Sequence, residues 1–424
     1  MGQINKFRST FILIMFFVLL NPVLAMTPKN YDEEYTEYKG IVVDKQTNKP
    51  LPFANILIDG TNITTVANSD GEFSVKIPVS ENQAIIVISY IGYKNFSSKV
   101  SEINWEKSKF ALEPVSIELP EVSVISKDAD ALVEAMLEKT VENYGNSEMF
   151  LTAFYRESIK KNRTYVSLSE AVVDIDKQAY ERYKSDVVRL YKSRKKTDYN
   201  KVDTLVFKLM GGPFNSLYLD IMKHTEMFFT ENRTDNYIFN FERSTRQNDK
   251  LIYVIDFKQK ETVNEPLYYG KLYIDAESLA LKSAVFNLNI ENKAEAASVF
   301  IVKKPFNARV YPVNASYRMD YFEKNGKWYY GYSRIELGLR INWKKKLFNT
   351  TYYSTIEMAT TNIEKSKSVS QTGVKDKLKQ NVIISDEASG FSDPEFWGEY
   401  NVIEPEKSIE SAIKKIQKQL KKEE

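Results

Sequence analysis

The stretch NSDGEF, at residues 68–73, holds the residues that most resemble a set of metal ligands. Asn68, Asp70 and Glu72 alternate along the chain as the first ligands of an EF-hand calcium loop do. That loop needs further oxygen ligands up to its twelfth position, but Pro78 and the alternating pattern of a strand occupy the same window. The Asp-Gly pair supplies the positive φ angles of a tight hairpin turn. We therefore predict a turn between two strands here and no metal site.

Two residue counts limit the other chemistry that the chain could perform. It has no cysteine, which excludes disulfides, thiolate nucleophiles, cysteine-ligated zinc and iron–sulfur clusters. It has one histidine, His224, whereas a zinc peptidase of the HExxH kind needs two imidazole ligands. A Ser-His-Asp triad would have to use His224, which stands in the apolar segment LDIMKHTEMFF with no nucleophile motif nearby. We expect no catalytic residues, no metal and no cofactor, and predict that the protein is not an enzyme.

The composition is that of soluble globular domains. The 424 residues are enough for two or three domains, and 43% of them are apolar and 27% charged. The net charge of +2 gives no electrostatic reason to expect nucleic acid as a partner.

The N-terminus has the pattern of a secretory signal peptide. A basic start is followed by an apolar run over residues 11–20, and small residues precede the end of the pattern. We predict a signal peptide over residues 1–25, cleaved between Ala25 and Met26. The apolar run is too short to cross a hydrocarbon core of ~30 Å as a helix. These features predict an exported protein in the periplasm or at the outer-membrane periphery, and they are compatible with peripheral membrane association.

Residues 36–118 consist of short alternating segments separated by turn residues. The segments YKGIVVD, FANILIDG and GEFSVKIP alternate apolar and polar residues, and AIIVISYIGY is apolar on both faces. Strands of this length and spacing are typical of an antiparallel β-sandwich.

The same segments carry a resemblance to a known family. The opening GIVVDKQTNKPLPFANILIDG, the turn NSDGEF and the end ISYIGYK together resemble the carboxypeptidase-regulatory-like domain common in Bacteroidota. The resemblance implies a transthyretin-like sandwich of seven strands. It also implies that this domain is a spacer or an interaction module and is not catalytic.

Residues 119–148 are predicted to form a linker followed by a helix. In DADALVEAMLEKTVENYG, apolar residues recur at three and four positions, and Asp128 can cap the helix.

Residues 149–362 are mostly predicted strands with aromatic or β-branched alternation, joined by turns such as KNGK. Long antiparallel strands in series suggest a curved or barrel-like sheet. The segment LYYGKLYIDAESLALKSAVF is similar to the strand–turn–strand unit of the half-barrels in periplasmic lipoprotein carriers. The predicted fold is therefore mainly β: an N-terminal transthyretin-like seven-stranded β-sandwich followed by a β-rich curved-sheet or half-barrel domain with a few helices.

Residues 363–424 are predicted to form a polar linker and a closing helix. Ile409, Ile413 and Ile416 give this helix an apolar stripe.

These features favour a non-enzymatic protein of the cell envelope, acting as an interaction or binding module in the periplasm or at the outer membrane. Two alternatives stay open. One is a periplasmic carrier that holds an apolar, lipid-like ligand in a half-barrel. The other is a surface glycan binder, for which the many aromatic residues provide the motive. The expected partner is an envelope protein or a lipid-like ligand, and the sequence does not identify ligand-binding residues.

Overall fold

The computed structural model describes eleven stretches of the chain, and every structural statement below concerns these residues. They are residues 34–115, 128–181, 184–197, 210–229, 235–242, 244–247, 250–300, 306–344, 349–364, 377–388 and 396–411. The chain divides into residues 1–34 and 35–424, and all elements named here belong to the second unit. The predicted cleavage site at Ala25 and Met26 lies outside the described residues. No helix in the described stretches combines the length and the apolarity needed to cross a membrane.

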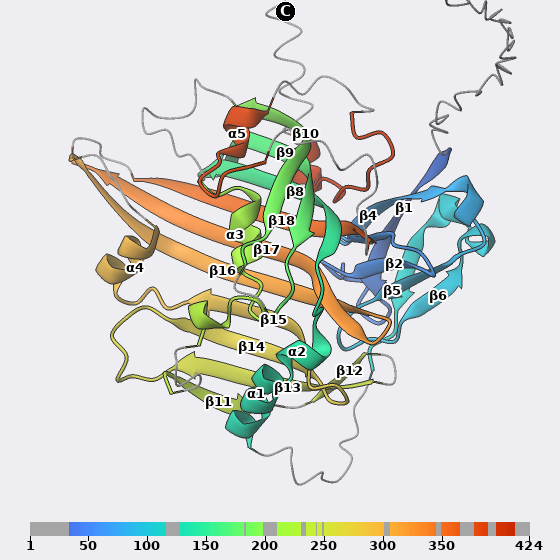
Figure 1. The fold of residues 1–424 in the computed structure, drawn as a ribbon. Helices are drawn as coiled ribbons and strands as arrows, with labels where there is room; N and C mark the ends of the chain where they lie inside the picture. Colours follow the sequence, from blue (N-terminus) through green and yellow to red (C-terminus); the bar gives the residue numbers. More distant parts are fainter. Residues whose placement is uncertain are drawn as a thin grey trace, which may run out of the picture. The chain divides into compact units, whose positions relative to one another are not determined.

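The N-terminal domain is a sandwich of a three-stranded and a four-stranded sheet, as predicted (Figure 1). One sheet has the order β4-β1-β7 and the other β3-β2-β5-β6. The strands are β1 (Tyr35–Asp44), β2 (Asn55–Asp59), β3 (Thr64–Val66), β4 (Glu72–Pro78), β5 (Ile85–Ser89), β6 (Phe96–Lys99) and β7 (Lys109–Leu112). The alternation in GEFSVKIP buries Phe73, Val75 and Ile77 between the sheets, each at most 1% exposed.

The stretch NSDGEF forms a turn into β4, but the predicted hairpin is wrong: β3 pairs with β2 and β4 pairs with β1, so the turn carries the chain from one sheet to the other. Asn68 Oδ1 accepts hydrogen bonds from the backbone N–H groups of Asp70 and Glu72, both at 2.9 Å. Gly71 has a φ of +75°, and a Cβ there would lie 2.7 Å from the carbonyl oxygen of Val42. Glycine is therefore required by both conformation and space.

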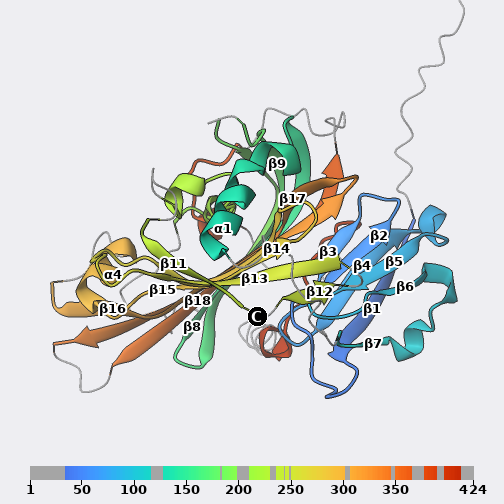
Figure 2. The ribbon, with the colours of Figure 1, turned by 90° about the horizontal axis from the view of Figure 1, so that it is seen from below.

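The second part of the chain forms one eleven-stranded sheet whose strands all pair antiparallel. Its order is β10-β9-β8-β18-β17-β16-β15-β14-β13-β11, with β12 also paired to β13. The strands are β8 (Met149–Lys161), β9 (Thr164–Lys177), β10 (Val187–Thr197), β11 (Tyr237–Phe241), β12 (Thr245–Gln247), β13 (Lys250–Gln259), β14 (Tyr268–Asp275), β15 (Leu281–Leu288), β16 (Ala308–Lys324), β17 (Lys327–Trp343) and β18 (Thr350–Glu364). Figure 2 shows that the sheet is curved, which confirms the predicted curved-sheet domain.

Helices cover part of the concave face of this sheet. Figure 2 shows α1 (Ala129–Glu138) inside the curve, where Leu132, Val133 and Met136 join the large apolar cluster of the concave face. The predicted cap is present, since Asp128 accepts a hydrogen bond from the N–H of Ala131 at 3.0 Å. The other helices are α2 (Thr140–Asn143), α3 (Pro213–Tyr218), α4 (Lys293–Phe300) and α5 (Ile384–Glu387). Of the predicted closing helix, residues 407–411 are helical and Ile409 is buried, whereas Ile413 and Ile416 lie outside the described residues.

A row of alternating charges crosses the convex face at right angles to the strands. The strand registers place Arg194 opposite Glu170, Glu170 opposite Arg156, Arg156 opposite Glu357, and Glu357 opposite Arg334. Each neighbouring pair forms an ion pair, with distances from 2.6 to 3.1 Å. Burial alone would raise the pKa of Glu170, but Arg156 and Arg194 hold that pKa below its ordinary value.

Arg156 lies at the centre of the charged row and is 3% exposed. We predict that Arg156→Met lowers the free energy of unfolding by about 3–5 kcal/mol, because Glu170 and Glu357 would stay buried without their shared cation. Urea unfolding at neutral pH measures this loss. Arg163→Met, at an exposed arginine of the β8–β9 turn, is the control and should stay within about 0.5 kcal/mol of the parent. A loss at Arg156 no larger than the control's would show that the row is not a source of stability.

Candidate functional site

The apolar concave face extends beyond the part that the helices cover. The large cluster contains residues of α1 and α3, and its strand residues are packed against them. A second cluster contains strand residues only, and we call it the strand-only cluster. Its buried members are Ile159, Val166, Ala308, Val310, Leu339, Ile341 and Tyr352, with Leu337 and Trp343 partly buried beside them. The concave face is therefore filled by side chains under α1 and α3, and its apolar residues continue into the strand-only cluster, which has no helix residue among its members although α4 packs beside β16.

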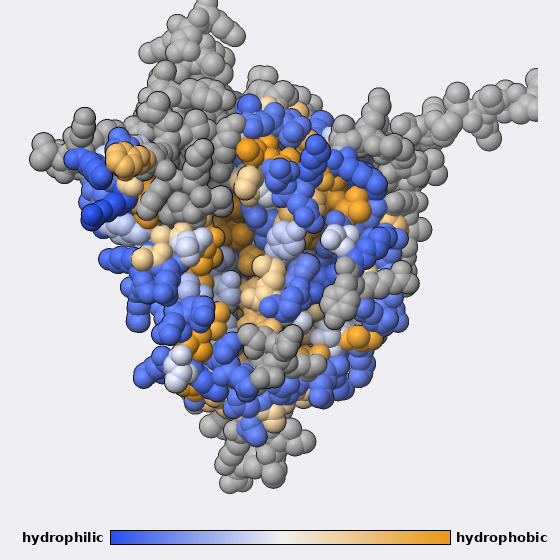
Figure 3. All heavy atoms as spheres, turned by 60° about the vertical axis from the view of Figure 1, so that its left-hand side comes forward, coloured by the Kyte–Doolittle hydropathy of each residue, from blue (hydrophilic) through white to orange (hydrophobic). Residues whose placement is uncertain are grey.

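The strand-only cluster lies at one end of the sheet. There β8 and β17 end, β16 and β18 begin, and α4 follows the end of β15; we call this the α4 end. Register places Val310 opposite Ile341, and Leu339 opposite Tyr352. Figure 3 shows the side of the molecule that includes this end, with a hollow whose interior is hydrophobic and whose surroundings are mostly hydrophilic.

Aromatic side chains border the large cluster toward the α4 end. Tyr268 begins β14, and its ring centroid lies 5.3 Å from that of Phe286 and 5.8 Å from that of Tyr317. Phe286 and Tyr317 stack at 5.2 Å. Tyr268 and Tyr317 are only partly buried. This group could contact an elongated apolar molecule through ring faces and edges.

Glu157 is a buried carboxyl group on the concave face. It stands between Tyr155 of the large cluster and Ile159 of the strand-only cluster, and it is 4% exposed. Tyr155 Oη donates a hydrogen bond to Glu157 Oε2 at 2.8 Å. Burial raises the pKa of Glu157 to about 7, and the nearby charge of Asp386 acts in the same direction. The concave face thus carries a group that titrates near neutral pH.

The raised pKa makes the stability of the fold depend on pH in a defined direction. The folded state holds the proton of Glu157 up to about pH 7, whereas a carboxyl with the ordinary pKa of 4.5 loses it earlier. The contribution of Glu157 to the free energy of unfolding is therefore fully present below pH 4.5, and it is lost as the pH rises to about 7. We predict that Glu157→Gln leaves stability unchanged below pH 4.5 and raises it above pH 7 by on the order of 1–3 kcal/mol.

Urea unfolding at the two pH values tests this prediction. Glu277→Gln, at an exposed glutamate of the β14–β15 turn, is the matched control and should change the free energy of unfolding by at most about 0.5 kcal/mol. An equal effect of Glu157→Gln at both pH values would contradict the titration and indicate a packing change instead.

A buried ion network holds residues 210–229 against the concave face. Lys177 Nζ lies 2.7 Å from Asp220 Oδ2 and 2.8 Å from Asp186 Oδ2. Tyr321 Oη donates to Asp220 Oδ1 at 2.7 Å. Asp220 is fully buried, and its partners are Lys177 of β9, Tyr321 of β16 and Tyr180, whose hydroxyl donates to Oδ2 at 2.9 Å. We interpret this network as structural, because it joins three segments of the core.

The single histidine has no catalytic surroundings in the described structure. The ring of His224 packs edge-on against Tyr218 at 5.4 Å, and its Nδ1 lies 3.6 Å from Glu226 Oε1. Burial lowers the pKa of His224, and Lys177 adds to that effect. No serine or threonine hydroxyl is bonded to it among the hydrogen bonds of the described residues.

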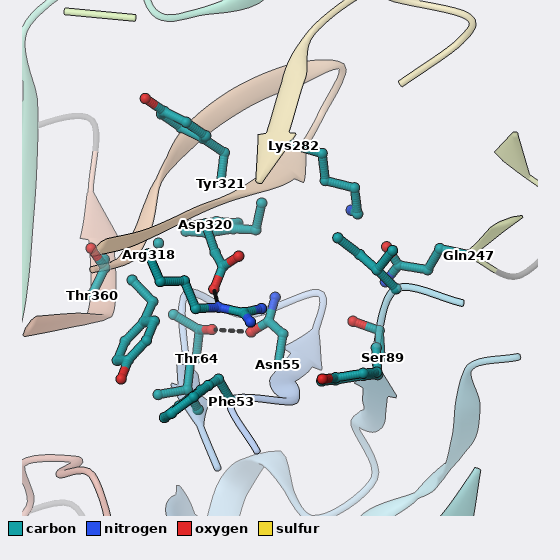
Figure 4. A pocket seen from close by; sticks show the side chains of 16 residues that line it. Phe53, Asn55, Thr64, Ser89, Gln247, Lys282, Arg318, Asp320, Tyr321 and Thr360 are labelled. Carbon is teal, nitrogen blue, oxygen red and sulfur yellow. Dashed lines mark hydrogen bonds and ion pairs between the residues drawn. The ribbon is translucent and has the colours of Figure 1, made fainter. Parts of the chain in front are cut away.

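A second candidate site is a cavity between the sandwich and the convex face (Figure 4). Its volume of ≈ 50 Å³ has room for a few water molecules. Figure 4 shows Arg318 near its centre, beside Asp320, and Lys282 and Gln247 extending toward it from another side. Arg318 Nε donates to Asp320 Oδ2 at 2.5 Å, and burial lowers the pKa of Lys282 to about 8. The lining mixes charged side chains with aromatic and aliphatic ones, and the cavity is too small for an elongated apolar ligand.

Phe53 forms one wall of this cavity in a strained backbone conformation. Its φ is +64°, a region that a bulky aromatic residue seldom adopts. Its ring stacks on Tyr332 at 5.5 Å, and the guanidinium groups of Arg318 and Arg334 lie 5.4 and 5.2 Å from the ring centroid. These contacts offset the strain and anchor the sandwich on the sheet.

A third cavity, of ≈ 370 Å³, lies at the other end of the sheet, near the β16–β17 turn. Lys324, Asn325 and Glu364 contribute to its lining, together with Met149 and Tyr329. Charged and amide groups at its surface favour water over an apolar occupant.

The turn NSDGEF contacts another part of the chain. We call residues 396–411 the C-terminal segment. Asn68 Nδ2 donates to the carbonyl oxygen of Glu404 at 3.2 Å, and Asp70 Oδ2 accepts from the N–H of Lys407 at 3.1 Å. Glu72 pairs with Lys407 Nζ at 2.9 Å. The three side chains that resemble calcium ligands in the sequence thus bind the protein's own C-terminal segment.

The C-terminal segment also contacts the edge of the sandwich and the charged row. The side-chain amide of Asn401 accepts from the N–H of Lys76 at 2.7 Å and donates to its carbonyl oxygen at 3.2 Å. Arg156 Nη2 donates to the carbonyl oxygen of Ile403 at 2.8 Å, and Trp397 packs edge-on against Phe154 at 5.5 Å. Sequence reasoning missed this role, because the partners are more than 200 residues apart and form no local pattern.

The paired hydrogen bonds of Asn401 give a specific prediction. Asn401→Asp removes the donor and places a negative charge beside the carbonyl oxygen of Lys76, so it should cost about 1–3 kcal/mol locally. Hydrogen exchange of the Lys76 amide should become faster in this variant. The control is Asn104→Asp, because Asn104 only accepts a hydrogen bond, from Glu106, and aspartate can do the same. Unchanged exchange at Lys76 would mean that Asn401 does not hold the segment.

Comparisons with known proteins bear on the sandwich alone. Residues 38–124 match the family model of the CarboxypepD_reg-like domain, which confirms the predicted carboxypeptidase-regulatory-like domain. No curated protein matches the sequence.

Solved structures give only a distant likeness. A LolA superfamily protein from Nitrosomonas europaea is 10% identical with a TM-score of 0.22, over 57% of this chain and 96% of that one. A DUF1329 family protein from Desulfovibrio piger is 8% identical with a TM-score of 0.22, over 58% of this chain and 98% of that one. A structure of lipovitellin is 9% identical with a TM-score of 0.25, over 55% of this chain and 27% of that one. TM-scores this low do not indicate a shared function.

Proposed function

We propose that this chain, with its carboxypeptidase-regulatory-like domain at residues 38–124, is a non-enzymatic binding protein of the cell envelope. Its ligand is an apolar, lipid-like molecule, held in the hollow at the α4 end of the sheet. The observation that carries the proposal is the strand-only cluster, which continues the apolar concave face past the helices.

The shape of the apolar surface supports an elongated ligand. The strand-only cluster extends over strands β8, β9, β16, β17 and β18, and the aromatic group of Tyr268, Phe286 and Tyr317 borders the large cluster beside it. The buried members of the strand-only cluster, 1% to 8% exposed, would form the floor of the site. A molecule lying there would replace water on the partly buried side chains beside it, Leu337, Trp343, Tyr268 and Tyr317. Each buried methylene group contributes about 0.8 kcal/mol, so an acyl chain of about ten carbons would contribute about 8 kcal/mol before the entropic cost of binding. The filled region under α1 and α3 limits the ligand to the α4 end.

The remaining parts of the structure are better suited to support than to binding. The turn NSDGEF and the edge strand β4 are occupied by the C-terminal segment. The cavity beside Phe53 is small, and charged side chains stand in its lining. We therefore assign the sandwich the role of a scaffold that is fixed on the convex face. No observation on the described residues favours glycan binding over this proposal.

Leu337 and Tyr353 allow a matched test of the hollow. Leu337 is a partly buried member of the concave face, whereas Tyr353 lies on the opposite face of the neighbouring strand and is 41% exposed. We predict that native mass spectrometry of the protein, purified from its host without detergent, shows bound mass that organic solvent extracts. Leu337→Asn should lower the loaded fraction several-fold, because it places an amide against the ligand. Tyr353→Asn should leave it unchanged.

A protein that carries no extractable mass and binds no added fatty acid or phospholipid would refute the proposal. Equal losses in the two variants would also contradict it, because they would show that the effect does not depend on the concave face. Thermal unfolding of both variants checks that the fold is retained.

A further inference from the structure

The tip of the sheet at the α4 end exposes apolar side chains to solvent. Phe306 is 94% exposed, more than any other large hydrophobic side chain in the described residues, and Val299 of α4 is 52% exposed. One exposed apolar residue is ordinary on a soluble protein, but two such residues, on α4 and just before β16, at one end of the sheet are less so.

Two chain connections meet at this tip. The N–H of Lys344, after β17, donates to the carbonyl oxygen of Asn307, before β16, at 3.0 Å. Lys344 Nζ lies 4.7 Å from the centroid of the Phe306 ring. The aromatic ring and the ammonium group are therefore presented together.

Cationic side chains gather around the same end. The register that pairs Lys161 with Tyr352 and Ala308 with Trp343 brings the β8–β9 turn to this end of the sheet. The cations there are Lys160, Lys161, Arg163, Lys293, Arg309, Arg340 and Lys344, and the acids on α4 and just before it are Glu291 and Glu295. The β13–β14 loop, at the same end of the sheet, adds Lys260, Glu261 and Glu265. Cations outnumber acids in this set, although the net charge of the whole chain is only +2.

We propose that the α4 end docks on an anionic lipid bilayer, with Phe306 and Val299 entering the interface and the surrounding lysines and arginines contacting the headgroups. The biological role of this docking rests on the proposed function, since a ligand could then pass between the bilayer and the hollow without crossing water. The surface itself is argued from its own residues.

A bilayer fits this surface better than the other partners of a basic patch. Phenylalanine, which has no polar group, gains from the acyl region, while long lysine side chains keep their ammonium groups at the headgroups. Nucleic acid would use the cations but would gain nothing from Val299. A protein partner would need a larger apolar area than the described tip offers. Local charge, rather than net charge, then sets the preference for anionic lipid.

Co-sedimentation with vesicles tests the proposal. The full protein is mixed with vesicles of phosphatidylcholine alone, or with vesicles that also contain phosphatidylglycerol. We expect binding to the anionic vesicles that weakens with salt, and little binding to the neutral ones. Replacing Phe306 and Val299 together with serine should weaken binding roughly tenfold or more. Lys344→Glu with Lys293→Glu should do the same for anionic vesicles only.

Matched controls lie away from the tip. Val141→Ser changes an apolar residue of α2 that is 46% exposed, and Lys99→Glu changes an exposed lysine of the sandwich. Both should bind vesicles as the parent does. Equal losses in the controls, or a parent protein that does not sediment with anionic vesicles, would overturn the proposal. So would full binding by the Phe306 and Val299 variant.

The two proposals fail in different ways. Native mass spectrometry reports the ligand and does not need vesicles. A protein that carries extractable mass but ignores anionic vesicles refutes docking and retains the proposed function. A protein that sediments but never carries a ligand retains docking and refutes the carrier. Nucleic acid would replace the bilayer as the partner if two results were obtained together. A short RNA would have to displace the parent protein from the vesicles at equal ionic strength, and the Phe306 and Val299 variant would have to lose RNA binding as strongly as it loses vesicle binding.

Discussion

The charged row on the convex face is the constraint on which the arrangement of the protein depends. Five side chains of alternating sign stand opposite one another on five neighbouring strands, and they are between 1% and 14% exposed. Buried charges need paired geometry, because an unpaired charge in the interior is strongly destabilising. A shift of register by one residue would move every member to the other face. The row therefore specifies register across the part of the sheet where the strands are furthest apart in sequence.

The row also determines what the two faces can do. On the convex face, Arg156 and Arg334 reach beyond the sheet, to the C-terminal segment and to Phe53 of the sandwich. That face is thus used for holding the parts of the chain together. The concave face has apolar side chains along its strands and one buried carboxyl, Glu157, at the boundary between its two clusters. The proposed site for an apolar molecule therefore lies on the concave face, beyond α1 and α3.

Local patterns in the sequence predicted the elements well. The Asp-Gly turn before β4, the Asn-Gly turn of KNGK and the cap at Asp128 each follow from the conformational preference of one or two residues. Alternation predicted the sandwich and a curved sheet of long strands. These features are local, so one sequence is enough to find them.

The features that create the candidate sites are not local. Arg156 and Glu357 become partners only through the pairing of β8 with β18, and alternation does not specify which strands pair. The spacing of Asn68, Asp70 and Glu72 suggested calcium ligands. Their partner in the structure, the C-terminal segment, is more than 300 residues away in sequence and gives no local signal. Phe306 stands in a sequence that alternation could have placed in a strand, and only the fold shows that it is exposed. The pKa of Glu157 depends on burial beneath α5, which no local signal reports.

The pairing of β8 with β18 has a consequence for the time course of folding. Arg156 and Glu357 are 201 residues apart, and the hydrogen bonds between these strands close a loop of that length. Contacts of such high sequence separation form slowly, and they cannot form until the chain has emerged as far as β18. Until then, β8 has one unpaired edge, and water reaches the side of Arg156 that is buried in the folded protein. A chain made from its N-terminus onward thus keeps its sheet open until almost its last segment is available, and the C-terminal segment can settle on the convex face only after that. Completion of the sheet and attachment of the sandwich are therefore late events, and a chain shortened before β18 would expose an edge strand to aggregation.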